Sequence, residues 1–128
     1  MKILRSGRRG QNLVEFAILL PVLVLFLLII IDLGRVVYSY SALHNAVREG
    51  ARYGIINPGS SAGIESRVRQ YAIGLNQNSL TVAVDSPNED TIEVTGIYEF
   101  HSASPILTLI TGSSVFTLQG VSAMQIED

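Results

Sequence analysis

The chain has 128 residues, of which 48% are hydrophobic, and it has no cysteine. This length allows one small domain beside a membrane anchor, and the absence of cysteine excludes disulfides and thiol chemistry. The formal net charge is −2, but residues 1–10 hold four of the nine Lys and Arg and none of the eleven acids. Residues 11–128 are therefore acidic, which argues against nucleic acid or anionic lipid as their main partner.

An almost unbroken apolar run extends from Leu13 to Leu33, with Glu15 near its start. A helix rises ~1.5 Å per residue, so about 20 such residues cross the ~30 Å hydrocarbon core of a bilayer. Cations precede the run, whereas the charges of Asp32 and Arg35 behind it nearly cancel. We therefore predict that the chain crosses the lipid of the inner (cytoplasmic) membrane once. By the positive-inside rule, its N-terminus is cytoplasmic and its C-terminal part is extracytoplasmic.

An ordinary secretory signal, cleaved after the apolar run, is an alternative interpretation of this segment. It fits poorly, because the run is longer than the roughly 7–15 apolar residues of a signal peptide and the helical pattern continues behind it. Pro21 lies inside the run and lacks an N–H. We expect it to kink the helix or to interrupt its hydrogen bonds near residue 17.

The helical pattern continues beyond the membrane with a narrower apolar face. Apolar or small residues recur in steps of four and three, at Val36, Tyr40, Leu43, Val47, Gly50 and Gly54. The opposite face is expected to carry Arg35, Ser39, Ser41, Asn45, Glu49 and Arg52. Asn57-Pro58-Gly59 ends the pattern, since the residue before proline avoids the helical region. The sequence therefore predicts a spine helix over 11–56, with a transmembrane half at about 13–33 and an amphipathic half that serves as a stalk.

A second helix is predicted at the start of an extracytoplasmic domain over residues 57–128. Ser60 or Ser61 suits its N-cap, and the asparagine-rich stretch from Asn76 is expected to end it. Its apolar face is expected to contain Ile64, Val68, Tyr71 and Leu75.

The hydrophobic period then changes to two, which is typical of strands. Residues 80–85 and 92–100 predict an antiparallel hairpin with a turn over 86–90. A short helix over 106–110 and a third strand over 114–126 follow. The predicted fold class is therefore α+β: a long N-terminal helix packed on one helix and a three-stranded, mainly antiparallel sheet.

A short motif stands between the basic leader at residues 1–10 and the span. Gly10 and Gln11 are followed, after three further residues, by Glu15 and Phe16 in the string GQNLVEF. This motif resembles the processing site of type IV prepilins, especially those of tight-adherence (Flp/Tad) systems. The resemblance implies that a prepilin peptidase cleaves after Gly10, so that Gln11 becomes the mature N-terminus. It also implies that Glu15 pairs with the new α-amino group of its own chain or of a neighbour during assembly.

Over residues 10–54 the chain resembles the TadE-like family of minor pilins or pseudopilins. The resemblance rests on the LVEFA start, the proline of LLP, the group from Asp32 to Arg35 and the NAVREGARYG end. It implies a pilin-like fold, other pilin or pseudopilin subunits as partners, and a part in assembling a Tad-type pilus. We expect the spine helix to pack through six of its residues: Phe16, Pro21, Val36, Tyr40, Leu43 and Val47.

Asp32 and Arg35 are three residues apart and therefore share one face of the helix at the outer interface. We interpret them as a surface ion pair that contributes a few tenths of a kcal/mol. The alternative is an ion pair between two subunits, which would set how the subunits align along a filament.

No pattern in the sequence predicts catalysis. His44 and His101 have no carboxylate at ligand spacing, and the acidic turn near Glu89 lacks the spacing of an EF-hand. No nucleotide-binding glycine loop or nucleophile motif is present. We therefore predict a non-enzyme with no metal, no cofactor and no small-molecule substrate. Two function classes remain: a pilus assembly subunit cleaved after Gly10, or an uncleaved, single-span, membrane-anchored binding or adaptor module.

Overall fold

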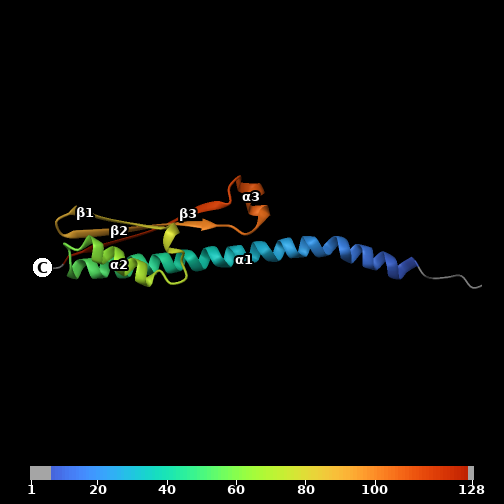
Figure 1. The fold of residues 1–128 in the computed structure, drawn as a ribbon, viewed down its shortest axis with the longest axis horizontal. Helices are drawn as coiled ribbons and strands as arrows, with labels where there is room; N and C mark the ends of the chain where they lie inside the picture. Colours follow the sequence, from blue (N-terminus) through green and yellow to red (C-terminus); the bar gives the residue numbers. More distant parts are fainter. Residues whose placement is uncertain (1–6, 127–128) are drawn as a thin grey trace, which may run out of the picture.

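The computed structural model describes residues 7–126, with side chains from Gly10 onward, so most of the predicted leader lies outside the described residues (Figure 1). The elements, in chain order, are α1 (Gly7–Ile56), α2 (Ser61–Tyr71), a 3-10 turn (Gln77–Ser79), β1 (Leu80–Asn88), β2 (Thr91–His101), α3 (Pro105–Thr111) and β3 (Val115–Gln125). This architecture confirms the predicted α+β class.

The spine is a single helix, α1, of 50 residues. At ~1.5 Å per residue it is about 75 Å long, which exceeds the thickness of a bilayer. The helix continues through Pro21 rather than ending there, and Figure 1 shows a gentle curve in its N-terminal half. It ends as predicted before Asn57, whose N–H donates to the carbonyl oxygens of Tyr53 and Gly54 at 3.1 and 3.2 Å.

The three strands form an antiparallel meander in the order β1-β2-β3. Every second residue of the central strand β2 is buried, at Ile92, Val94, Gly96, Tyr98 and Phe100. This face covers the C-terminal half of α1, and α2 packs along the same half (Figure 1). Leu43, Val47, Gly50 and Gly54 of the apolar seam are therefore buried under the sheet and α2, while the N-terminal half of α1 projects beyond them.

The core is built from all of these elements. Leu43 and Val47 of α1, Ile64 and Val68 of α2, and Val94 of β2 are completely buried. Leu43 lies under the sheet where Gly96 of β2 pairs with Gly120 of β3, because two residues without side chains leave room for it. The core therefore joins the stalk to the outer elements in one packed unit.

Gly50 marks the closest approach of α1 and α2. A Cβ atom placed on Gly50 would overlap the Cγ2 atom of the fully buried Val68 and lie 3.6 Å from Cγ2 of Ile64. Gly34, on the same helix, has no atom within 4 Å of such a Cβ. The two glycines therefore form a matched pair, one crowded and one open.

We expect Gly50→Ala to lower the free energy of unfolding by about 1–3 kcal/mol, the usual cost of overpacking a core. Gly34→Ala adds the same methyl group in open space and is expected to stabilise the helix by up to about 1 kcal/mol. Thermal unfolding of the full chain in detergent, followed by circular dichroism, compares the two. Equal melting temperatures of the two variants would contradict the packing of α1 on α2 at Gly50.

The second helix is capped as predicted but ends earlier than predicted. The Ser60 hydroxyl accepts a hydrogen bond from the Gly63 N–H at 3.3 Å. The helix ends at Tyr71, and Leu75 is buried in the turn that follows, not on the helix. Gly74 in that turn has a φ of +78°, a left-handed conformation that glycine adopts without strain.

The hairpin also differs from its prediction in one detail. Strand β1 continues through Pro87 to Asn88, so the turn is shorter than the predicted 86–90. The register is irregular between Asp85 and Asn88. A proline in an edge strand is tolerated at such an irregularity, since it has no N–H to contribute to the ladder.

Candidate functional site

The residues of the prepilin-like motif lie at the exposed end of α1. Gly10, Gln11 and Glu15 are helical and exposed, and no other described element covers them. Glu15 forms no ion pair with any residue whose side chain is described. Because Gln11 and Glu15 are four residues apart, their backbones lie one helical turn from each other.

The apolar half of α1 is bare in the single chain. Residues 10–56 are part of a helix long and apolar enough to cross a membrane, and the most apolar window of this helix is not buried at all. Phe16 and Pro21 lie on this bare part, with Phe16 exposed beside Leu19, Leu20 and Leu23. Their predicted packing therefore has no partner among the described residues.

The C-terminal half of the spine has its packing partners within the chain. Leu43 and Val47 are completely buried, and Val36 is partly buried against the core. Tyr40, in contrast, is 50% exposed and stacks on His44 with ring centroids 6.0 Å apart. Its expected place in the core is taken by Ser39, which is 7% exposed, so the prediction that Ser39 lies on the solvated face is wrong.

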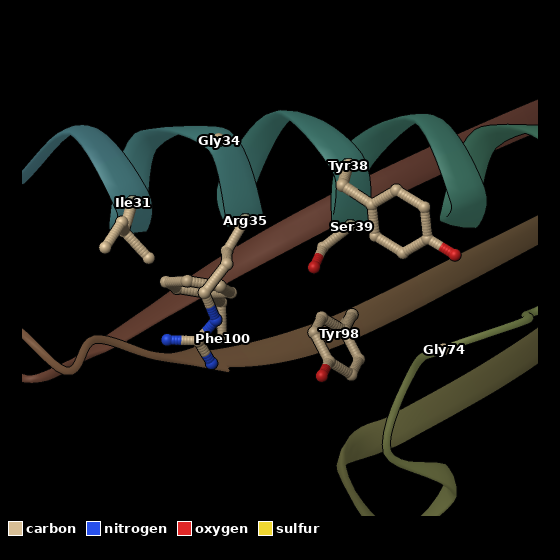
Figure 2. Close-up of a pocket in the computed structure, with 8 residues that line it drawn as sticks. All are labelled: Ile31, Gly34, Arg35, Tyr38, Ser39, Gly74, Tyr98 and Phe100. Atoms are coloured by element: carbon tan, nitrogen blue, oxygen red, sulfur yellow. The ribbon is translucent and has the colours of Figure 1, made fainter.

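The packing of Ser39 has a steric reason. Ser39 faces Tyr98 and Phe100 of β2, two large rings that leave room for a small side chain on α1 (Figure 2). The helical period allows either residue 39 or residue 40 between positions 36 and 43. The aromatic residues of β2 therefore decide which of the two faces the sheet.

Asp32 is completely buried at the outer end of the apolar run. Its Oδ2 accepts hydrogen bonds from the Ser104 N–H at 2.7 Å and the Ser102 hydroxyl at 2.9 Å. Its Oδ1 accepts from the Ala103 N–H at 3.3 Å and from Nη1 of Arg35 at 3.0 Å. Four donors, three of them from the segment between β2 and α3, therefore surround one carboxylate. We call these residues, Asp32, Arg35, Ser102, Ala103 and Ser104, the Asp32 joint.

The Asp32 joint corrects the interpretation of Asp32 and Arg35 as a surface ion pair. Arg35 is half exposed as expected, but Asp32 is buried and fastens the spine to a segment some 70 residues later in the chain. A buried carboxylate is tolerated only where several donors replace water. The sequence contained a weak signal for them, since Ser102 and Ser104 precede the proline that opens α3.

A shallow groove of about 390 Å³ adjoins the joint on the sheet side (Figure 2). The Arg35 guanidinium lies over the Phe100 ring, 5.0 Å from its centroid, an attractive cation–π arrangement. The Tyr38 hydroxyl donates to the carbonyl oxygen of Ile73 at 3.0 Å. These contacts tie α1 to β2 and to the turn after α2, so the polar groups of the groove serve the packing of the fold.

No group of three or more potential metal ligands occurs among residues 7–126. His44 is partly buried beside Tyr40, and His101 is exposed at the end of β2, so the two histidines belong to different elements. The arrangement of the described residues offers fastening and packing.

Comparison with known protein families gives a match to most of the spine helix. Residues 10–52 match the family model described as TadE-like protein. This part of the chain is TadE-like. The match contains the prepilin-like motif, the apolar run, Asp32 and the stalk as far as Arg52, and so it contains every residue that the sequence assigned to processing, assembly, spine packing or ion pairing. It confirms the resemblance found in the sequence.

No curated protein and no solved structure shows significant similarity to the chain. The family match is confined to residues 10–52, and the single apolar helix is consistent with a single-pass anchor. The family match ends at residue 52, four residues before the end of α1 and just beyond the close approach of α1 and α2 at Gly50.

Proposed function

We propose that the protein is a non-catalytic minor pilin or pseudopilin that takes part in assembling a Tad-type type IV pilus. The observation that carries the proposal is the TadE-like helix, with Gly10 and Glu15 before a bare apolar half. Its other half is already packed in an α+β domain. A subunit of this shape leaves its apolar half free for lipid first and for neighbouring subunits afterwards.

Processing is the first step of the proposed role. A prepilin peptidase on the cytoplasmic side hydrolyses the peptide bond between Gly10 and Gln11, which removes the basic leader and leaves an α-amino group on Gln11. The removal takes away four cations, and the remaining chain is acidic. The new amine lies one helical turn from Glu15, because the two residues are four apart in α1.

Assembly is the second step, and Glu15 is its proposed anchor. A carboxylate in the middle of a span costs about 2.5–3.5 kcal/mol on insertion scales, and less near an interface. Glu15 has no partner among the described side chains, so an amine from the mature N-terminus of its own chain or of a neighbour is proposed to neutralise it. Phe16 and Pro21 then lie against adjacent apolar helices.

The N-terminus of the protein from its native membranes tests the proposal. We expect intact mass and the N-terminal peptide to show a chain that begins at Gln11, because the peptidase recognises the glycine before the span. Gly10→Ala should abolish this cleavage and leave the leader attached. Gly34→Ala, in the same helix but away from the motif, should be cleaved like the wild type.

Either outcome of this measurement has a definite meaning. A wild-type chain that retains residues 1–10 would contradict the proposal and favour the uncleaved adaptor module. Cleavage of Gly10→Ala at the wild-type position would contradict the assignment of Gly10 as the processing site.

A further inference from the structure

The short helix α3 presents its largest apolar side chains to the outside. Leu109 is 83% exposed and Ile110 is 75% exposed, the two most exposed large hydrophobic side chains of the described chain. Val115, at the start of β3, is exposed beside them in sequence. Adjacent exposed apolar residues of this size mark a contact surface, since water solvates them poorly.

The Asp32 joint determines the level of α3 along the spine. Ser104, the N-cap of α3, donates its N–H to Asp32 at 2.7 Å, and Asp32 is near the outer end of the apolar run. Figure 1 shows α3 at the end of the sheet that faces the bare half of α1. With seven residues α3 is about 10 Å long, so all of it lies near the level at which a span over residues 13–33 leaves the hydrocarbon core.

The chain on either side of α3 is uncharged, which suits a position at the membrane interface. No residue from Ser102 to Ile126 carries a charge. The exposed Tyr38 and Tyr40 lie on α1 just beyond Asp32, and tyrosines are enriched at membrane interfaces. Arg35 is the nearest cation on α1, and its guanidinium is already committed to Asp32 and Phe100. The surface therefore suits uncharged acyl chains and zwitterionic headgroups rather than an anionic ligand.

We propose that α3 inserts Leu109 and Ile110 into the outer leaflet beside the span, as a second, interfacial contact with the bilayer. The occupant of this apolar surface is phospholipid, because the Asp32 joint holds α3 at the outer end of the apolar run, where a bilayer spanned by residues 13–33 has its outer leaflet. The inference depends on membrane anchorage of α1 and is independent of cleavage after Gly10. Two contacts with the bilayer, joined rigidly by Asp32, hold the sheet in one orientation toward the membrane while the subunit is anchored there.

Tryptophan fluorescence tests the proposal, because the chain contains no tryptophan. Leu109→Trp is compared with Val121→Trp in the full chain, reconstituted in phosphatidylcholine bilayers with or without brominated acyl chains. Val121 is the matched control, since it is an exposed aliphatic residue of β3, six positions along the strand from Val115 and therefore about 20 Å away. We expect brominated lipid to remove most of the Leu109→Trp emission, which should also be blue-shifted, and to leave Val121→Trp unchanged.

Two results would overturn the proposal. The first is quenching of Leu109→Trp that is no stronger than that of Val121→Trp. The second is a blue-shifted, unquenched Leu109→Trp emission that grows with the ratio of protein to lipid, which would mean that a second copy covers α3. Both positions are exposed, so neither variant disturbs the core, and circular dichroism verifies the fold. The N-terminal mass of the wild-type protein reports separately on the proposed processing.

Discussion

Alanine at position 32 is expected to release the segment between β2 and α3 from the spine helix. The completely buried carboxylate of Asp32 accepts from four donors. Without it the Ser104 N–H, in a residue that is 1% exposed, loses its 2.7 Å hydrogen bond and keeps only the longer one to the Ser102 hydroxyl oxygen, at 3.2 Å. The Ser102 hydroxyl and the Ala103 N–H lose their bonds to the carboxylate as well, and each hydrogen bond to a charged group contributes about 1.5–3 kcal/mol. The stability of the Asp32 joint should therefore fall sharply, while the core around Leu43 stays folded.

Hydrogen exchange of the full chain in detergent measures this release locally. Peptides that contain residues 102–104 should exchange faster in Asp32→Ala than in the wild type, whereas peptides from the middle of β2 should not change. Arg35→Ala is the matched control, because the guanidinium is half exposed and such pairs contribute at most about 1 kcal/mol. Unchanged exchange at 102–104 in Asp32→Ala would show that the carboxylate does not hold this segment.

Loss of the Glu15 carboxylate is expected to impair assembly while leaving processing intact. Glu15→Ala retains Gly10 and should be cleaved, but it lacks the acceptor for the amine on Gln11. A hydrogen bond to a charged group contributes about 1.5–3 kcal/mol, so incorporation into pili should fall by about tenfold to hundredfold. The ratio of the subunit in sheared pili to that in membranes, read by immunoblot with N-terminal mass, measures the effect.

Glu99→Ala controls for the loss of an acid, since Glu99 is exposed on β2 and its neighbour Phe100 contacts Arg35, about 30 Å along α1 from Glu15. It should enter pili like the wild type. Equal incorporation of the wild type, Glu15→Ala and Gly10→Ala would refute the parts of Glu15 and of cleavage in assembly, and absence of the wild-type subunit from sheared pili would favour the uncleaved adaptor module.

Much of the architecture was predictable because the corresponding signals are local. The apolar run between Leu13 and Leu33 specifies a span, and the steps of four and three after it specify an amphipathic stalk. Alternation in 92–100 specifies the buried face of β2, and the observed burial follows it. The prepilin-like motif around Gly10 is likewise contiguous in sequence, and the family match includes it.

The errors arose where neighbours distant in sequence determine the result. Periodicity cannot choose between Ser39 and Tyr40, because both fit the helical step, and the choice depends on Tyr98 and Phe100 across the interface. The end of α2 at Tyr71 depends likewise on the turn with Gly74, which contacts Tyr38 of α1. Such contacts join residues that are far apart in the sequence. They cannot be read from a local pattern, because they form only when the sheet packs on the spine.

By itself, then, the sequence determined the span, the stalk, the α+β class and the prepilin-like motif, because each follows from residues that are close together in the chain. Tertiary structure alone decided that Asp32 is buried and fastens α3 at the outer end of the span. The four donors of its carboxylate include three from a segment that begins 70 residues later. A charge at the edge of an apolar helix requires partners, but only the folded chain shows which groups supply them.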